Sequence, residues 1–217
     1  AERRFTGAVH ASPGWYGAGI AGFNVGDAYT SAVYAAGWPA PTFAVTDGKL
    51  PAGIELDAGT GVISGTATVA GPYSFEITAS NAAGTVTETF TGAVNQQVTW
   101  TAEILSQMIV GAPYEHTLTA VGYPAPTYSV FSGPLPAGIE LDADTGVLSG
   151  TPTSTGHFSI MLRATNTSGP SVTRVLSGWV YEAIGWDDQT ISGFQVGHAY
   201  NDAVHATGYP APTYQVT

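Results

Sequence analysis

Residues 35–66 read AAGWPAPTFAVTDGKLPAGIELDAGTGVISGT, and residues 120–151 read AVGYPAPTYSVFSGPLPAGIELDADTGVLSGT. The two stretches align without a gap, and 23 of the 32 aligned positions are identical. Self-similarity at a fixed period is the signature of a tandem repeat. The chain is therefore built from copies of one unit, and the fold of that unit decides the fold of the protein.

Tryptophan marks the phase of the repeat. Trp15, Trp100 and Trp186 are separated by 85 and then by 86 residues. This period predicts two complete repeats, the first over residues 15–99 and the second over residues 100–185.

The two ends of the chain carry partial copies of the same pattern. Residues 5–9 read FTGAV and match residues 90–94, so we expect residues 1–14 to be the final strand of a truncated upstream repeat. Residues 186–217 match the beginning of a repeat, and we expect them to form the first strands of a truncated downstream repeat.

Hydrophobic residues alternate with polar ones inside each repeat, which is typical of a strand with one buried face. The clearest case is Tyr73, Phe75, Ile77 and Ala79. Further β-rich runs occupy residues 28–35, 42–47, 54–57, 62–66 and 86–94, separated by Gly, Pro, Asn or Asp clusters. About seven short strands in such a repeat predict an all-β fold of tandem immunoglobulin-like β-sandwiches.

The alternation also predicts a core for the first repeat. Its expected members are Tyr29, Phe43, Ile54, Leu56, Val62, Ile63, Tyr73, Phe75 and Ile77. Val62 and Ile63 are adjacent, so both cannot face inward on one flat strand. The Pro-Ala-Pro element at Pro39 lacks backbone donors, which predicts an edge or a loop there.

Composition excludes several classes of function. The 217 residues include 16 acidic and 5 basic ones, so the formal net charge is −11. Nucleic-acid binding requires neutralisation of phosphates, so no nucleic-acid partner is expected. The chain has no cysteine, which excludes disulfides and thiolate sites. No apolar run approaches the 18 residues or so of a membrane span, and membrane insertion is not expected.

The order of motifs in the second repeat resembles the He-PIG family of immunoglobulin-like repeats. The motifs are YPAPTY at 123–128, LPAGIELD at 135–142, TGVLSGTP at 145–152 and ATN at 164–166. The resemblance implies cadherin-like and immunoglobulin-like sandwiches in tandem arrays of bacterial surface and secreted proteins, and also on phage virions. It implies spacers, stalks and adhesion modules without an enzymatic activity of their own.

An acidic turn is the first candidate site. Asp142 and Asp144 resemble the start of a calcium loop, but the first repeat has Gly59 in place of the second Asp. An EF-hand also needs a bidentate Glu twelve positions along, which is missing. Asp and Gly favour tight turns in any case, so we interpret the segment as a turn. Calcium is the alternative, with Asp187 and Asp188 as a second weak candidate, and no other metal or cofactor is expected.

The three tryptophans are the second candidate. We interpret Trp15, Trp100 and Trp186 as inter-repeat junction residues that bury an indole against the neighbouring repeat. Stacking against sugars is the alternative. No catalytic residue is expected, because none of the histidines recurs between the copies and no nucleophile motif accompanies them. These histidines are His10, His116, His157, His198 and His205.

Together these features predict a non-enzymatic array that acts as an extracellular spacer or stalk of a larger surface protein. Its expected partners are the neighbouring repeats of the same chain, with surface glycans or other surface proteins as further candidates. Two alternatives remain open. One is decoration of a phage tail or capsid that holds host glycans weakly and multivalently, and the other is an accessory region of a secreted carbohydrate-active enzyme.

Overall fold

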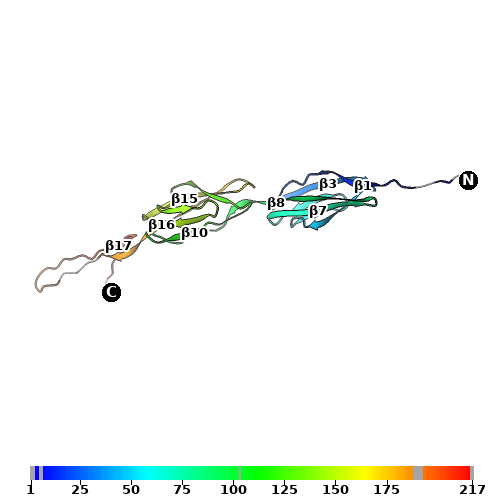
Figure 1. The fold of residues 1–217 in the computed structure, drawn as a ribbon. Coiled ribbons are helices and arrows are strands. Elements are labelled where there is room, and N and C mark those ends of the chain that lie inside the picture. Colours follow the sequence, from blue (N-terminus) through cyan, green and yellow to red (C-terminus); the bar gives the residue numbers. More distant parts are fainter. Residues whose placement is uncertain (1–2, 5–6, 103, 188–192, 216–217) are drawn as a thin grey trace. The chain divides into compact units, whose positions relative to one another are not determined.

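The computed structural model describes residues 3–4, 7–102, 104–187 and 193–215. The chain divides into two compact units, the first containing residues 1–97 and the second containing most of residues 98–217. Every regular element in the described part is a strand, which confirms the all-β prediction. Figure 1 shows that the strands of each unit form two layers.

The first unit is a sandwich of two antiparallel sheets. Its elements are β1 (Ala11–Ala18), β2 (Phe23–Asn24), β3 (Ala28–Trp38), β4 (Thr42–Gly48), β5 (Ile54–Leu56), β6 (Val62–Thr66), β7 (Gly71–Asn81) and β8 (Gly84–Trp100). One sheet has the order β1-β3-β6-β5, and the other contains β8-β7-β4 with β2 parallel to β8. The runs expected from alternation all became strands, whereas β1 and β2 had no such signal.

The core of the first unit lies between its two sheets. The expected residues Phe43, Ile54, Ile63, Phe75 and Ile77 are buried there. Three other expected residues are partly buried and pack against that core, namely Tyr29, Leu56 and Tyr73. Ile63 is inward and Val62 is not in the cluster, as their adjacency required. Ala79, which the alternation placed on the inward side of its strand, is buried as well, and the sequence analysis missed four members, which are Phe23, Val33, Ala67 and Val94.

The second unit repeats this plan. Its elements are β9 (Met108–Ile109), β10 (Tyr114–Thr117), β11 (Ala120–Tyr123), β12 (Thr127–Ser132), β13 (Ile139–Leu141), β14 (Val147–Gly150), β15 (Gly156–Thr165), β16 (Val172–Trp186) and β17 (Ala206–Tyr209). One sheet has the order β10-β14-β13 and the other has the order β12-β15-β16-β17. β9 runs parallel to β16, as β2 does to β8.

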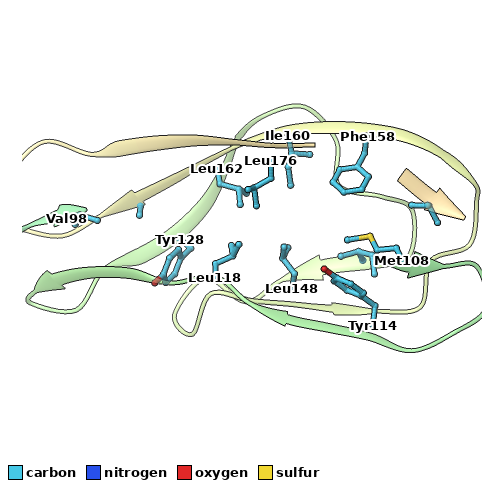
Figure 2. Packing of buried hydrophobic residues seen from close by; sticks show 13 residues of the cluster. Val98, Met108, Tyr114, Leu118, Tyr128, Leu148, Phe158, Ile160, Leu162 and Leu176 are labelled. Carbon is cyan, nitrogen blue, oxygen red and sulfur yellow. The ribbon is translucent and has the colours of Figure 1, made fainter. Parts of the chain in front are cut away.

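Apolar side chains from the two sheets of the second unit meet in the middle. Figure 2 shows Leu148 pointing from one layer towards Ile160, Leu162 and Leu176 on the other. No polar or charged residue is among the buried residues of the described chain. Burial of apolar surface is therefore what holds each sandwich together.

The Pro-Ala-Pro elements lie outside the strands, as predicted. Each follows a cis peptide bond, at Trp38–Pro39, Tyr123–Pro124 and Tyr209–Pro210. In the first unit this loop is tied to the hairpin turn after β7, because Asn81 Nδ2 donates to the Pro39 carbonyl at 2.8 Å. The described residues include no helix with the length and hydrophobicity needed to span a membrane.

Candidate functional surface

Each tryptophan that marks the repeat packs on an aromatic ring that follows it by 28 residues in the sequence. Trp15 lies 5.9 Å from Phe43, measured between ring centroids, and Trp100 lies 5.7 Å from Tyr128. The partial third copy has the same pair, because Trp186 lies 6.1 Å from Tyr214. The indole and its aromatic partner are therefore a recurring part of the sandwich.

The environment of the three indoles differs. Trp15 and Trp100 are partly buried and pack against the cores of the first and second units. Trp100 Nε1 also donates to the Val172 carbonyl at 3.3 Å, whereas Trp186 is 71% exposed. These contacts describe packing within a unit, and the junction role stays a prediction.

The carboxylates of the acidic turns accept hydrogen bonds from residues of the same turn. In the first unit, Asp57 Oδ1 accepts hydrogen bonds from the backbone N–H of Gly59 at 2.9 Å and from both the N–H and the hydroxyl of Thr60 at 2.8 Å. The hydroxyl bond of Thr60, followed by the two backbone bonds, stabilises the charged form and lowers the pKa of Asp57 below its ordinary value.

The equivalent turn of the second unit has the same design. Asp142 Oδ1 accepts from the N–H of Thr145 at 2.8 Å and of Asp144 at 3.0 Å. These bonds, that of the Thr145 N–H above all, lower the pKa of Asp142. Both turns join the two strands of a hairpin, so the carboxylate shapes the backbone of the hairpin, which is the role that the turn interpretation assigns to it.

The calcium candidates do not converge in the described structure. Asp144 and Asp187 are exposed, and Asp188 lies outside the described residues. Within the described ranges, no three His, Cys, Asp or Glu side chains are grouped so that they could hold a metal ion. Calcium binding at Asp142 and Asp144 stays an untested alternative.

The outer face of the β4-β7-β8 sheet carries a ladder of threonines. Thr78 Oγ1 lies 2.8 Å from Thr46 Oγ1 and also 2.8 Å from Thr87 Oγ1. Beside the ladder, Thr89 Oγ1 donates to Glu76 Oε1 at 3.3 Å. Hydroxyls that bond to each other satisfy their polar atoms locally, so this face is polar in composition but already hydrogen-bonded.

The same face of the second unit, on β12-β15-β16, is aromatic and cationic. The Arg163 guanidinium carbon lies 4.0 Å from the centroid of the Phe131 ring, which is cation–π geometry. His157 and Trp179 are direct cross-strand partners, and their rings contact each other edge to face at 5.1 Å. The outward residues of this face remain open to solvent: Phe131 is 50% exposed, Val175 is 55% exposed and Trp179 is 45% exposed.

A β-bulge positions the aromatic ring at the edge of this face. Cross-strand pairing skips one residue between Val130 and Ser132, so Phe131 is the extra residue. The first unit has the same irregularity, with Thr46 as the extra residue. A bulge changes the direction of the side chain that it carries. Both units have the bulge at the same position, and its extra residue is Thr46 in the first unit and Phe131 in the second.

The charge of the two sheets is opposite in sign. Residues 42–48, 71–81 and 84–94 contain Asp47, Glu76 and Glu88 and no Lys or Arg. The corresponding residues 127–132, 156–165 and 172–181 contain two Arg and one His and no acidic residue. In a chain of net charge −11, the second of these sheets is a local exception.

The two arginines of that sheet have different partners. Arg174 lies in a groove of about 710 Å³ along β16, and its Nη1 donates to the Thr101 carbonyl. Arg163 makes no hydrogen bond or ion pair within the described part of the chain, and its Nε is buried without a hydrogen-bond partner. Arg163 is therefore the cation of this face that is free to meet an external acid.

The sequence analysis did not single out this face, although a signal was present. Alignment of the repeats places Phe131 opposite Thr46, Arg163 opposite Thr78, and Trp179 opposite Ala93. Identical positions in this alignment mark what the copies share. The positions where they differ mark the surface that sets one unit apart from the other.

Solved structures with a similar fold are chains of immunoglobulin domains. The N-terminal four Ig domains of Dscam1 isoform 1.9 match with a TM-score of 0.55 at 12% identity, over 80% of this chain and 46% of that chain. The N-terminal eight Ig domains of Down Syndrome Cell Adhesion Molecule isoform 1.30.30 match with a TM-score of 0.52 at 20% identity, over 77% and 24%. These likenesses show the fold.

Glycosidases are also among the matches. An endo-fucoidan hydrolase of glycoside hydrolase family 107, MfFcnA4, has a TM-score of 0.36 at 22% identity over 82% of this chain and 30% of that chain. The chain spans less than a third of the length of the glycosidase structures that it matches. A search of curated proteins finds no match.

The sandwich topology agrees with the result of the family comparison. The He_PIG family, described as "Putative Ig domain", matches residues 16–95 and again residues 98–181. These two matches cover most of the sequence. The chain belongs to the He_PIG family of immunoglobulin-like domains and contains two of them in tandem.

Proposed function

We propose that this chain is a non-enzymatic structural and adhesive segment of an extracellular array, in which each domain adds length to a larger surface protein. The observation that carries the proposal is the structural use of every recurring motif. The repeated tryptophan packs on a repeated aromatic ring, and the repeated Asp accepts hydrogen bonds from its own turn. What the two copies share therefore builds the scaffold.

Three further features support a spacer. Each unit has its own core, so a repeat can be added to an array without changing the core of its neighbour. The apolar cores close without disulfides, because the chain contains no cysteine. Low basic charge limits nonspecific adsorption to polyanions.

The spacer role is tested by changing the number of repeats. Small-angle scattering would compare the chain with a version in which residues 100–185 are duplicated. A sandwich with strands of about 8 residues at about 3.3 Å per residue spans roughly 30 Å. We expect the maximum dimension to grow by a similar step for one added repeat. A compact particle with no such increase would contradict the spacer role.

The cellular location needs a separate test on the parent protein. Limited proteolysis of intact cells, followed by mass spectrometry of the released peptides, is expected to recover peptides from residues 15–185. Recovery of the same peptides from purified phage particles, and not from cell surfaces, would replace the surface stalk with the virion alternative.

A further inference from the structure

We propose that the outer face of β12-β15-β16 binds the outer face of β4-β7-β8 in a second copy of this chain. The first of these, the aromatic face, contains Phe131, His157, Met161, Arg163, Val175 and Trp179, with Ser159 and Ser177 between them. The second, the acidic face, consists of Thr46, Asp47, Glu76, Thr78, Thr87 and Thr89. The inference does not depend on where the parent protein resides.

The composition of the aromatic face is that of a protein interface. Interface cores are enriched in aromatic residues, Met and Arg and are depleted in Lys, Glu and Asp. This face has Phe131, Trp179, Met161 and Arg163, and none of residues 127–132, 156–165 and 172–181, which form it, is acidic; the first acidic residue along β16 is Glu182. Trp and Arg are also the residues that most often dominate binding energy when they become buried.

The fold does not require these side chains. The acidic face occupies the same place on the same sheet, with Thr78 where the aromatic face has Arg163 and Glu76 where it has Met161. The sandwich forms with either set. Phe131 contacts Arg163, and Trp179 contacts His157 and Tyr209, yet both rings remain about half exposed. A partner that buries the exposed part of these rings explains their presence.

The acidic face offers the charge that Arg163 lacks. Asp47 and Glu76 are direct cross-strand partners on β4 and β7, so two carboxylates stand opposite each other. Like charges directly opposite on a sheet are destabilising. A guanidinium placed between them would relieve this repulsion and donate hydrogen bonds to both carboxylates. Arg163 has no acidic partner in the described part of its own chain.

The threonine ladder lowers the cost of burying the acidic face under another protein surface. Thr46, Thr78 and Thr87 already bond to one another through their hydroxyls. Covering them with another surface would therefore not strand unsatisfied polar groups, which is the main cost of burying a polar face. Two flat sheet faces can pack about 10 Å apart.

The two faces are different, and every copy carries both of them. Such a contact is heterologous, so a bound chain still presents one free face of each kind unless the assembly closes. We therefore expect the average mass to rise with concentration. Neighbouring arrays would associate side by side through many weak contacts of this kind.

The experiment is sedimentation velocity of the 217-residue chain over a wide concentration range, at low salt and at about 0.5 M NaCl. We expect concentration-dependent association that weakens in high salt, because ionic strength screens the Arg–carboxylate contact. Arg163→Glu alone and Glu76→Arg alone are each expected to weaken self-association at least tenfold. The double variant, and an equimolar mixture of the two single variants, should associate again.

Matched controls carry the same change of charge elsewhere. Arg4→Glu, in the exposed segment before β1, and Glu140→Arg, on β13 of the opposite sheet, alter exposed residues that belong to neither face and should associate like the unmodified chain. Circular dichroism and melting temperature establish that every variant is folded. The proposal is overturned if the unmodified chain stays monomeric at several hundred micromolar, or if Arg163→Glu associates normally.

A failure of the mixture or the double variant to associate would also overturn the pairing of Arg163 with Glu76. A third arm tests the chemical alternative with a soluble carboxylated or sulfated polysaccharide. If the chain is monomeric and binds this polysaccharide through Arg163, the aromatic face is a glycan site and the self-association proposal is wrong.

Discussion

The β4-β7-β8 sheet of the first unit and the β12-β15-β16 sheet of the second have the same inward face and opposite outward faces. Ile77 and Leu162 occupy equivalent inward positions, and each is fully buried. At the outward positions on either side of them, Glu76 and Thr78 of one unit correspond to Met161 and Arg163 of the other. The two copies therefore share the inward residues that form the core, whereas their outward residues are free to differ and to serve a separate purpose.

The largest expected effect comes from the shared interior. Ile77→Ala and Leu162→Ala each remove a side chain with 0% exposure, and each should lower the stability of its own unit by about 2–5 kcal/mol. Hydrogen exchange with mass spectrometry of peptides from each unit measures both losses in the intact chain. Clearly unequal losses of stability would show that the two cores are not equivalent.

A backbone contact shared by the units gives the next largest effect. A Cβ on Gly150, where φ is +140°, would overlap the carbonyl oxygen of Gly138, which directly precedes the neighbouring strand β13. Gly156 has a similar φ of +136° but open space around the added atom. We expect Gly150→Ala to cost about 2 kcal/mol more than Gly156→Ala in thermal or urea unfolding. Equal losses would mean that backbone conformation alone requires glycine at position 150.

The outer faces should contribute far less to stability. The Phe131–Arg163 contact is partly exposed, and a cation–π pair of this kind contributes about 0.5–1 kcal/mol. A double-mutant cycle with Phe131→Ala and Arg163→Met measures that coupling by urea denaturation. Thr46→Ala, at the equivalent bulge position, is the matched control and should stay within about 0.5 kcal/mol. A coupling of several kcal/mol would assign the aromatic face to the fold and leave it no separate role.

The smallest effect is confined to acid and tests the two hairpin turns. The pKa of Asp57 and that of Asp142 lie below the ordinary value, so their contribution to stability is complete above about pH 4 and is lost as the pH falls through the native pKa. Asp57→Ala and Asp142→Ala should each flatten the fall in melting temperature between about pH 4 and pH 2.

Asp144→Ala is the control for the loss of these hydrogen bonds, because no hydrogen bond to the Asp144 carboxylate is present in the described structure. It should lower the melting temperature at pH 7 less than Asp142→Ala does. Added calcium should leave the melting temperature of the chain unchanged as well. A rise of several degrees with calcium that Asp142→Ala abolishes would contradict the turn interpretation and establish the metal site.

Sequence periodicity predicted most of the sandwich but not all of it. Long strands such as β7 show a clear alternation, whereas β2 has only two residues, too few for any period to be visible. Phe23 was missed for this reason, although it is fully buried. Val33 was missed because its strand mixes small and polar residues, so its burial depends on the sheet that covers it.

The candidate residues were predicted unevenly. Recurrence drew attention to Trp15 and Trp100, and the structure packs both on aromatic partners at equivalent positions. Recurrence could not draw attention to Arg163 or Trp179, since their importance lies in differing from the first repeat. The sequence analysis assigned His157 no catalytic role and no partner, and only the cross-strand register places it against Trp179.

The repeat, the all-β class and the alternation that turns one side of each strand inward could be predicted from the sequence, because they depend on local periodicity and on comparison of one copy with another. Which outward residues contact each other depends on how the strands pair in the folded sheet. Phe131 and Arg163 are 32 positions apart, as are Thr46 and Thr78, and strand pairing brings each pair into contact. Long-range register is a property of the folded sheet, and it is what makes one face a hydrogen-bonded ladder and the other an aromatic surface with an unpaired cation.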